Sequence, residues 1–233
     1  MESIAAAFKS IFDKLSDFFN LFDLSFFVSG IVTATSIIEL LRQFEITLDV
    51  SDGYRWFALI VFAYLSGLIS FAIGSRIRMR RMKGTSYSDL YTAIKRHGAE
   101  EIAYFKEYKE RADGGLEGLY TRMWTIVREM DDIPVSNALL KRYWVMTATY
   151  DGLAFSCICW VFNFFMYWHR EYWAYPSHRE WGIWVILFLG IGVVAFLSWN
   201  CTSQAMKYKR YQIEELTATF IEFYLKREKG EDI

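Results

Sequence analysis

The 233-residue chain has few of the residues that mark turns, disulfides or metal sites, with only two prolines, three cysteines and three histidines. So few prolines argue against a disordered chain and against an all-β fold with many turns. Cys157, Cys159 and Cys201 are too few, and too close to apolar stretches, for the disulfide framework of a small secreted protein. With 26 basic and 27 acidic residues, the chain also lacks the net positive charge of nucleic-acid-binding proteins, so we expect no direct nucleic-acid partner.

Large apolar side chains are abundant, because 54% of the residues are hydrophobic and 19% are aromatic. A soluble domain of this length does not usually have an interior large enough to bury them. A helix needs about 20 apolar residues to cross a bilayer, and four stretches approach this length. They are residues 24–41, 56–74, 152–168 and 181–199. We therefore predict an all-α integral membrane protein with four transmembrane helices in the lipid bilayer.

The basic residues are distributed unevenly around these stretches. Cytoplasmic flanks of membrane proteins collect Lys and Arg, and a topology with four spans places 22 of the 26 basic residues on one side. Only Arg42, Arg55, Arg170 and Arg179 fall on the other side. We therefore predict a multi-pass protein of the cell inner membrane with both termini in the cytoplasm.

Five segments follow from this topology. Apolar residues at spacings of three and four predict an N-terminal amphipathic helix over 1–23, either on the inner leaflet or packed on the protein itself. The other segments are a transmembrane hairpin over 24–74, a cytoplasmic helical segment over 75–144, a second transmembrane hairpin over 145–200 and a cytoplasmic helix over 201–233. In the cytoplasmic segment we expect helices near 86–111 and 116–130, and the entry of a further helix at 131–134, with the proline tolerated in its first turn.

The first span carries a polar stripe, whose members lie within an arc of about 120° on a helix of 100° per residue. They are Ser29, Thr33, Ser36, Glu39 and Gln43. Such a stripe is typical of a helix that faces a water-filled path or an oligomer axis. The alternative is that the hydroxyl groups bond to neighbouring helices while Glu39 lies among the outer headgroups.

Small residues recur in two other spans. They are Ser66, Ser70, Gly74, Gly190 and Gly192. Small side chains allow helix backbones to approach closely, so we predict that these residues lie at helix-packing contacts.

A basic cluster follows the second span directly. It consists of Arg76, Arg78, Arg80, Arg81 and Lys83. Topology explains such a cluster, which would also attract anionic lipid headgroups. A soluble anionic ligand and a protein contact are the alternatives.

Beyond the fourth span, apolar residues continue at helical spacing. They are Ile213, Leu216, Phe220 and Tyr224. A projecting helix with an apolar stripe needs a partner, which is either the helices of 86–130 or the same helix in another copy.

No pattern typical of catalysis is present, because the sequence has no Gly-rich phosphate loop, zinc-binding spacing or serine nucleophile elbow. We expect no cofactor and no metal. We predict a non-enzymatic homo-oligomer that couples a cytoplasmic protein partner or signal to the membrane, for example a sensor or effector subunit of a bacterial antiviral defence system. The alternatives are an ion channel lined by the first span and a membrane enzyme with an unrecognised site.

The predicted layout resembles that of stator-type proton-channel proteins such as the flagellar motor A subunit. In both, a long cytoplasmic segment precedes the last two spans, and both of these spans continue into the cytosol. The resemblance covers topology only, because the small-residue and proline-containing motifs of that family are missing from 152–168 and 181–199.

Overall fold

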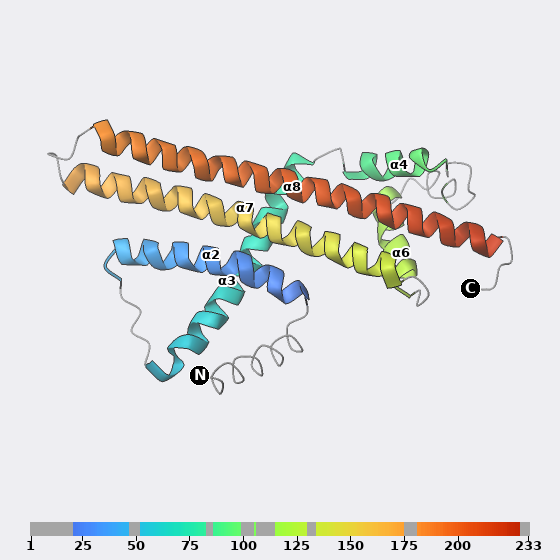
Figure 1. The fold of residues 1–233 in the computed structure, drawn as a ribbon, viewed down its shortest axis with the longest axis horizontal. Coiled ribbons are helices and arrows are strands. Elements are labelled where there is room, and N and C mark those ends of the chain that lie inside the picture. Colours follow the sequence, from blue (N-terminus) through green and yellow to red (C-terminus); the bar gives the residue numbers. More distant parts are fainter. Residues whose placement is uncertain are drawn as a thin grey trace, which may run out of the picture. The chain divides into compact units, whose positions relative to one another are not determined.

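The computed structural model describes residues 21–46, 52–82, 86–98, 105, 115–129, 134–174 and 181–228. Nearly all of these residues are helical and none is in a strand, which confirms the all-helical prediction. The helices are α2 (Leu21–Gln43), α3 (Asp52–Arg81), α4 (Ser86–Arg96), α6 (Gly115–Glu129), α7 (Pro134–Ala174) and α8 (Trp181–Glu228) (Figure 1). The amphipathic helix predicted over 1–23 lies almost entirely outside the described residues.

Four of the described helices, α2, α3, α7 and α8, are long and apolar enough to cross a membrane. This finding confirms the prediction of four apolar spans. Helix α7 has 41 residues and α8 has 48. At 1.5 Å per residue α8 is roughly 70 Å long, more than twice the hydrocarbon thickness of about 30 Å. Only part of α8 therefore fits within the hydrocarbon of a bilayer.

The chain divides into two compact units. Unit 1 comprises Met1–Ile77 and Ala148–Gln204, and unit 2 comprises Arg78–Thr147 and Ala205–Ile233. The division falls inside α3, α7 and α8, so each of these continuous helices contributes residues to both units.

Glycines set the distance between α2 and α3 in unit 1. A Cβ atom on Gly30 would lie 1.9 Å from the carbonyl oxygen of Ala63, and one on Gly67 would lie 1.8 Å from that of Phe26. Both neighbours are backbone atoms, which cannot rotate away as a side chain can. The crossing of α2 and α3 in Figure 1 therefore requires residues without a side chain at both positions.

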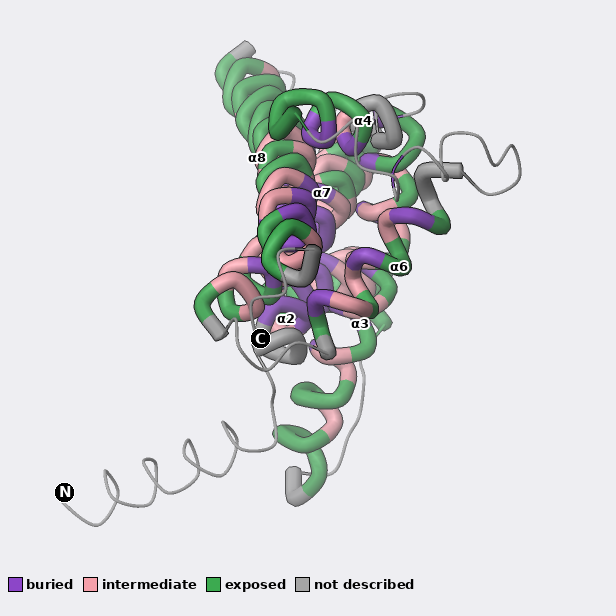
Figure 2. The backbone as a smooth tube through the Cα atoms, turned by 90° about the vertical axis from the view of Figure 1, so that its right-hand side faces the viewer, coloured by how far each residue is buried: buried purple, intermediate pink, exposed green. Residues whose placement is uncertain are grey.

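Unit 2 has an apolar core to which α4, α6, α7 and α8 contribute. Its buried members are Leu90, Ala93, Ile94, Phe105, Leu119, Met123, Val127, Leu140, Ile213, Leu216, Phe220 and Ile221. Full burial of one large apolar side chain contributes about 1.5–3 kcal/mol, so this cluster is the main stabilising element of unit 2. Figure 2 shows buried positions recurring between exposed ones along α6, as expected for an amphipathic helix.

The helix predicted near 86–111 does not continue through that range, because α4 ends at Arg96. Gly98 has a φ of 63°, a left-handed conformation that glycine adopts without steric cost. Its N–H donates to the carbonyl oxygen of Lys95 at 3.0 Å and so closes the end of the helix. By contrast, α7 begins at Pro134, within the helix entry predicted over 131–134.

Candidate functional site

The inner part of the predicted polar stripe lies in the interior of unit 1. Ser29, Thr33 and Ser36 are at most 2% exposed. Thr33 Oγ1 lies 2.7 Å from Ser70 Oγ on α3 and 2.7 Å from Ser156 Oγ on α7. Three helices therefore meet at one hydroxyl cluster, defined as Thr33, Ser70 and Ser156.

The hydroxyl cluster has acceptors for all of its hydrogens. Ser70 Oγ lies 2.6 Å from the carbonyl oxygen of Ser66, and Ser156 Oγ lies 2.9 Å from that of Gly152 and 3.1 Å from that of Ser29. Each hydroxyl has one hydrogen to donate, and the available acceptors outnumber the three hydrogens. The three hydroxyl groups thus bond to one another and to backbone oxygens of the same chain. This is the arrangement expected if the polar stripe holds neighbouring helices together.

Asn163 extends the polar contact between α2 and α7. Its Nδ2 donates to the carbonyl oxygen of Ser36 at 2.6 Å and lies 2.5 Å from Ser36 Oγ. Trp160 Nε1 donates to the carbonyl oxygen of Val32 at 3.3 Å. Asn163 Oδ1, although buried, has no hydrogen-bond partner among the described residues. One strong acceptor in the interior of unit 1 therefore remains available.

The outer part of the stripe differs from the inner part. Glu39 is 41% exposed and lies 3.8 Å from Arg42 on the same helix. The backbone oxygen of Gln43 accepts a hydrogen bond from Arg170 Nη1 on α7 at 2.5 Å, while Gln43 Oε1 is buried without a partner in the described part of the chain. The five predicted residues thus divide into three interior hydroxyls and two residues at the end of α2.

The predicted packing residues have unequal surroundings. Ser66 is buried in unit 1, and a Cβ atom on Gly74 would lie 1.9 Å from the carbonyl oxygen of Asp151 on α7. A Cβ atom on Gly190 would reach only an ordinary 4.0 Å contact with a ring atom of α7, and one on Gly192 would meet nothing within 4 Å. The small residues of α3 therefore form close contacts, whereas Gly192 faces open space.

Sequence reasoning missed Asp151, which directly precedes the predicted third span. Its side chain is 1% exposed in unit 1, and its backbone forms the close contact with Gly74. A buried carboxylate at the edge of an apolar stretch is costly and usually has a specific role. The available signal was a charged residue next to Gly152 in a helix that continues without a break on both sides.

The basic cluster does not form one patch. Arg76, Arg80 and Arg81 are exposed, whereas Arg78 is only 8% exposed, and Lys83 lies outside the described residues. Arg78 Nη1 donates to Met82 Sδ at 3.7 Å. Arg78 therefore differs from the exposed arginines of the cluster, because its side chain is buried in unit 2.

A second polar group lies inside unit 2, and we call it the donor cluster. It consists of Arg78 on α3, Tyr120 and Trp124 on α6, and Lys209 and Gln212 on α8. Tyr120 Oη accepts hydrogen bonds from Lys209 Nζ at 2.7 Å and from Trp124 Nε1 at 3.0 Å. Lys209 Nζ also donates to Gln212 Oε1 at 3.1 Å and lies 4.4 Å from the centre of the Tyr120 ring.

Burial raises the pKa of Tyr120 to about 12, while the hydrogen bond from Trp124 and the charge of Arg78 lower it by smaller amounts. The phenol therefore keeps its proton at neutral pH, and this hydrogen remains to be donated. Gln212 is 0% exposed, and its Nε2 has no acceptor among the described residues. The donor cluster thus combines positive charge with unused N–H and O–H hydrogens.

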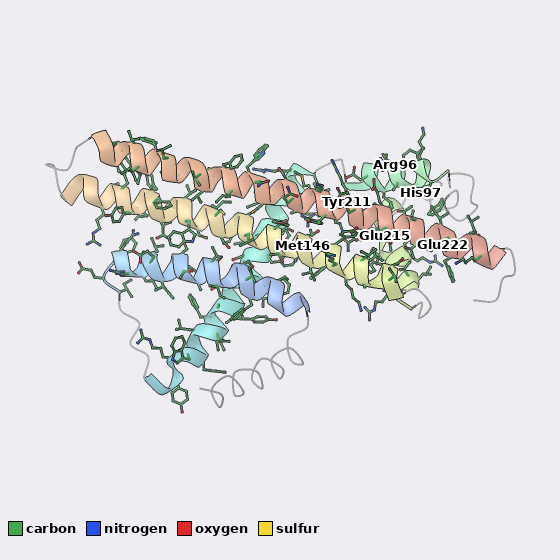
Figure 3. The ribbon with its side chains drawn as sticks, viewed as in Figure 1. Arg96, His97, Met146, Tyr211, Glu215 and Glu222 are labelled. Carbon is green, nitrogen blue, oxygen red and sulfur yellow. The ribbon has the colours of Figure 1, made fainter. Side chains whose placement is uncertain are left out.

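The apolar stripe of α8 lies within the core of unit 2. Ile213, Leu216 and Phe220 are at most 2% exposed, and Tyr224 packs against them. Figure 3 shows Tyr211, Glu215 and Glu222 along the same helix, so polar side chains alternate with this stripe. Within the chain, the stripe packs against the helices of 86–130 and against α7. The helices of 86–130 and a second copy of α8 are the two alternative partners that the sequence predicts.

No group of three or more His, Cys, Asp or Glu residues that would hold a metal occurs within the described ranges. His169 is exposed, and the three cysteines are free thiols. Comparison of the chain with family models, curated proteins and solved structures gives no match.

Proposed function

We propose that the protein is a non-enzymatic, self-associating membrane protein that couples a cytoplasmic partner or signal to its membrane helices. In this proposal unit 1 is the membrane bundle and unit 2 is the cytoplasmic part, with both termini in the cytoplasm of a bacterial cell. This orientation leaves only four of the 26 basic residues on the outer side. A sensor or effector subunit of a larger bacterial system is the role that fits this description.

The observation that carries the proposal is the continuity of three helices. Each of α3, α7 and α8 contributes residues to both units without a break in the helix. Helices are stiff, and packed helices respond to a ligand by small shifts or rotations of whole elements. A change in the packing of unit 2 therefore has a direct covalent route to the helices of unit 1.

The surface of α8 supports self-association. Ile186, Phe188 and Leu189 are each more than 60% exposed, and Gly192 adds a position with open space around it. A second copy or lipid covers such a face, and close packing at a small residue is a common way in which membrane helices associate.

Coupling is tested by amide hydrogen exchange on the full chain in nanodiscs. Leu216→Ala opens a cavity in the core of unit 2, and coupling predicts faster exchange in α2 and α7 of unit 1 as well as in α6. Leu225→Ala, the same change at an exposed position of α8, is the matched control. Unchanged exchange in unit 1 would show that the units behave independently and would contradict the proposal.

Self-association is tested by native mass spectrometry of protein released from nanodiscs. The proposal expects a defined oligomer whose population falls in Gly192→Leu, because a large side chain prevents close approach at this position. Gly118→Leu on α6, where a Cβ atom also meets nothing within 4 Å, is the control. A wild-type monomer over the whole accessible concentration range would disprove self-association.

The alternative function is an ion channel lined by the polar stripe of the first span. One observation favours it, because the buried acceptor Asn163 Oδ1 has no hydrogen-bond partner among the described residues. A buried acceptor of this kind is a position where water or an ion can bind. The internal satisfaction of the hydroxyl cluster favours packing instead. Planar-bilayer recording separates the two functions, because a channel predicts a conductance that changes in Thr33→Val and Glu39→Ala, whereas the coupling proposal predicts none.

A further inference from the structure

The donor cluster in unit 2 has more hydrogen-bond donors than acceptors. Tyr120 Oη accepts two bonds, from Lys209 and Trp124, so its lone pairs are occupied while its own hydrogen has no acceptor among the described residues. Gln212 Oε1 is likewise occupied by Lys209, and its Nε2 has two further hydrogens without an acceptor in that part of the chain. The Tyr120 hydroxyl hydrogen and the two Gln212 Nε2 hydrogens therefore have no acceptor among the described residues.

Exchanging the two ends of the Gln212 amide does not remove this excess. The exchange would turn the Nε2 hydrogens toward the ammonium group of Lys209, so two donors would face each other. The oxygen therefore belongs on the Lys209 side, and the unpaired group is a donor. A buried N–H group without an acceptor lowers the stability of the folded state, so an acceptor at this place would stabilise the protein.

The donor cluster also contains two positively charged side chains, Arg78 and Lys209. Arg78 is 8% exposed, and its charge is close enough to act on the Tyr120 hydroxyl. A multiply charged oxyanion binds where positively charged side chains and hydrogen-bond donors lie together. The donor cluster offers an arginine, a lysine and neutral donors without an acceptor around one buried amide.

We propose that the donor cluster binds a phosphate group, as inorganic phosphate, a soluble phosphomonoester or the phosphomonoester headgroup of an anionic lipid. Phosphate offers several acceptor oxygens, so one group accepts hydrogens from Gln212 Nε2 and the Tyr120 hydroxyl while Arg78 and Lys209 balance its charge. The inference goes beyond the proposed function, because it requires neither self-association nor coupling between the units.

The test uses the full chain in nanodiscs of neutral phosphatidylcholine, with inorganic phosphate titrated by calorimetry at constant ionic strength. Lys209→Met is compared with Lys207→Met, which removes an exposed lysine from the same helix. Loss of a charged hydrogen-bond donor typically weakens binding about tenfold or more. We therefore expect at least this loss in Lys209→Met and less than about a twofold change in Lys207→Met.

Tyr120→Phe and Gln212→Leu provide tests that do not remove a charge. Phenylalanine keeps the ring near Lys209 and removes only the hydroxyl, so a folded variant with weaker phosphate binding supports the site. Gln212→Leu removes the unpaired amide, and we expect a higher thermal stability without phosphate and a smaller increase on its addition. If wild type and both variants gain the same stability from phosphate, the site does not exist.

A lipid arm of the experiment identifies the source of the phosphate. Nanodiscs that contain phosphatidic acid are compared with phosphatidylcholine nanodiscs, and the lipids retained by the protein are counted by native mass spectrometry. Retention of phosphatidic acid that is lost in Lys209→Met but not in Lys207→Met supports a headgroup site, and phosphate binding in solution supports a soluble ligand. Equal losses in the two lysine variants, or no binding in either arm, would overturn the proposal.

Discussion

The two units differ in how their polar and apolar side chains are distributed. The interior of unit 1 contains hydroxyls such as those of Thr33 and Ser156, while Trp56, Ile186 and Phe188 are 77%, 73% and 64% exposed. The apolar core of unit 2 consists of Leu, Ile, Val, Met, Phe and Ala side chains, and the surface of this unit has the ion pairs of α4 with α8. Hydroxyl contacts between helices thus characterise the interior of unit 1, whereas unit 2 has a large apolar core with the donor cluster beside it.

This contrast indicates that the two units are stable for different reasons. In the proposed topology unit 2 lies in water, which drives its apolar side chains into the core. In lipid no comparable force acts between apolar helices, and association depends on close packing and on hydrogen bonds between helices. Unit 1 has both of these features, in the glycine contacts of α3 and in the hydroxyl cluster.

The largest expected effect is in the apolar core. Leu216→Ala should lower the free energy of unfolding of unit 2 by about 2–5 kcal/mol, because it leaves a cavity at a position that is 0% exposed. Amide hydrogen exchange of α6 and α8 measures this change. Leu225→Ala, at a residue that is 42% exposed, should stay within about 0.5 kcal/mol of wild type. Similar values for both variants would mean that unit 2 lacks a packed core.

Close backbone packing in unit 1 gives the next effect. Gly74→Ala should destabilise unit 1 by about 3 kcal/mol, because the added methyl group would lie 1.9 Å from the Asp151 carbonyl oxygen and the helices must separate. Reversible unfolding in mixed dodecyl sulfate micelles gives the free energy. Gly182→Ala on α8 meets nothing within 4 Å and should be neutral or slightly stabilising. The close contact has no energetic importance if the two alanine variants are equally stable.

Tyr120 predicts a pH dependence that belongs to unit 2 alone. Its pKa rises from an ordinary 10.0 to about 12 on folding, so the folded state holds its proton more tightly between these pH values. Its contribution to stability is complete below about pH 10 and is lost as pH rises to about 12, a change of the order of 2 kcal/mol. The difference in unfolding free energy between wild type and Tyr120→Phe across this range measures it. A constant difference would contradict the burial of the phenol.

The smallest effect is expected in the hydroxyl cluster. Thr33→Val should destabilise unit 1 by about 1 kcal/mol, because a hydrogen bond between membrane helices contributes only this much. Thr35→Val is the matched control, since the Thr35 hydroxyl is exposed and bonds only to carbonyl oxygens of its own helix. Unfolding in mixed micelles compares the two variants. Equal stability would assign the cluster no role in holding α2, α3 and α7 together.

Helix content and apolar length were predictable because they depend on local sequence. The helix start at Pro134 follows from its fixed φ angle, and the long apolar runs follow from counting residues. The end of α4 was missed because Gly98 was not recognised as a helix stop. The donor cluster was missed as well, because its five residues come from three segments of the chain and share no motif.

The sequence by itself determined that this chain is helical and has four apolar stretches of membrane-spanning length, since both depend on neighbouring residues. Only the tertiary structure decided which polar groups meet. Thr33 bonds to residues 37 and 123 positions away, and Arg78 is buried while Arg76 and Arg80 are exposed. Helical periodicity assigns a residue to a face, but the partner of that face depends on how distant helices cross, and this in turn depends on packing along the whole chain.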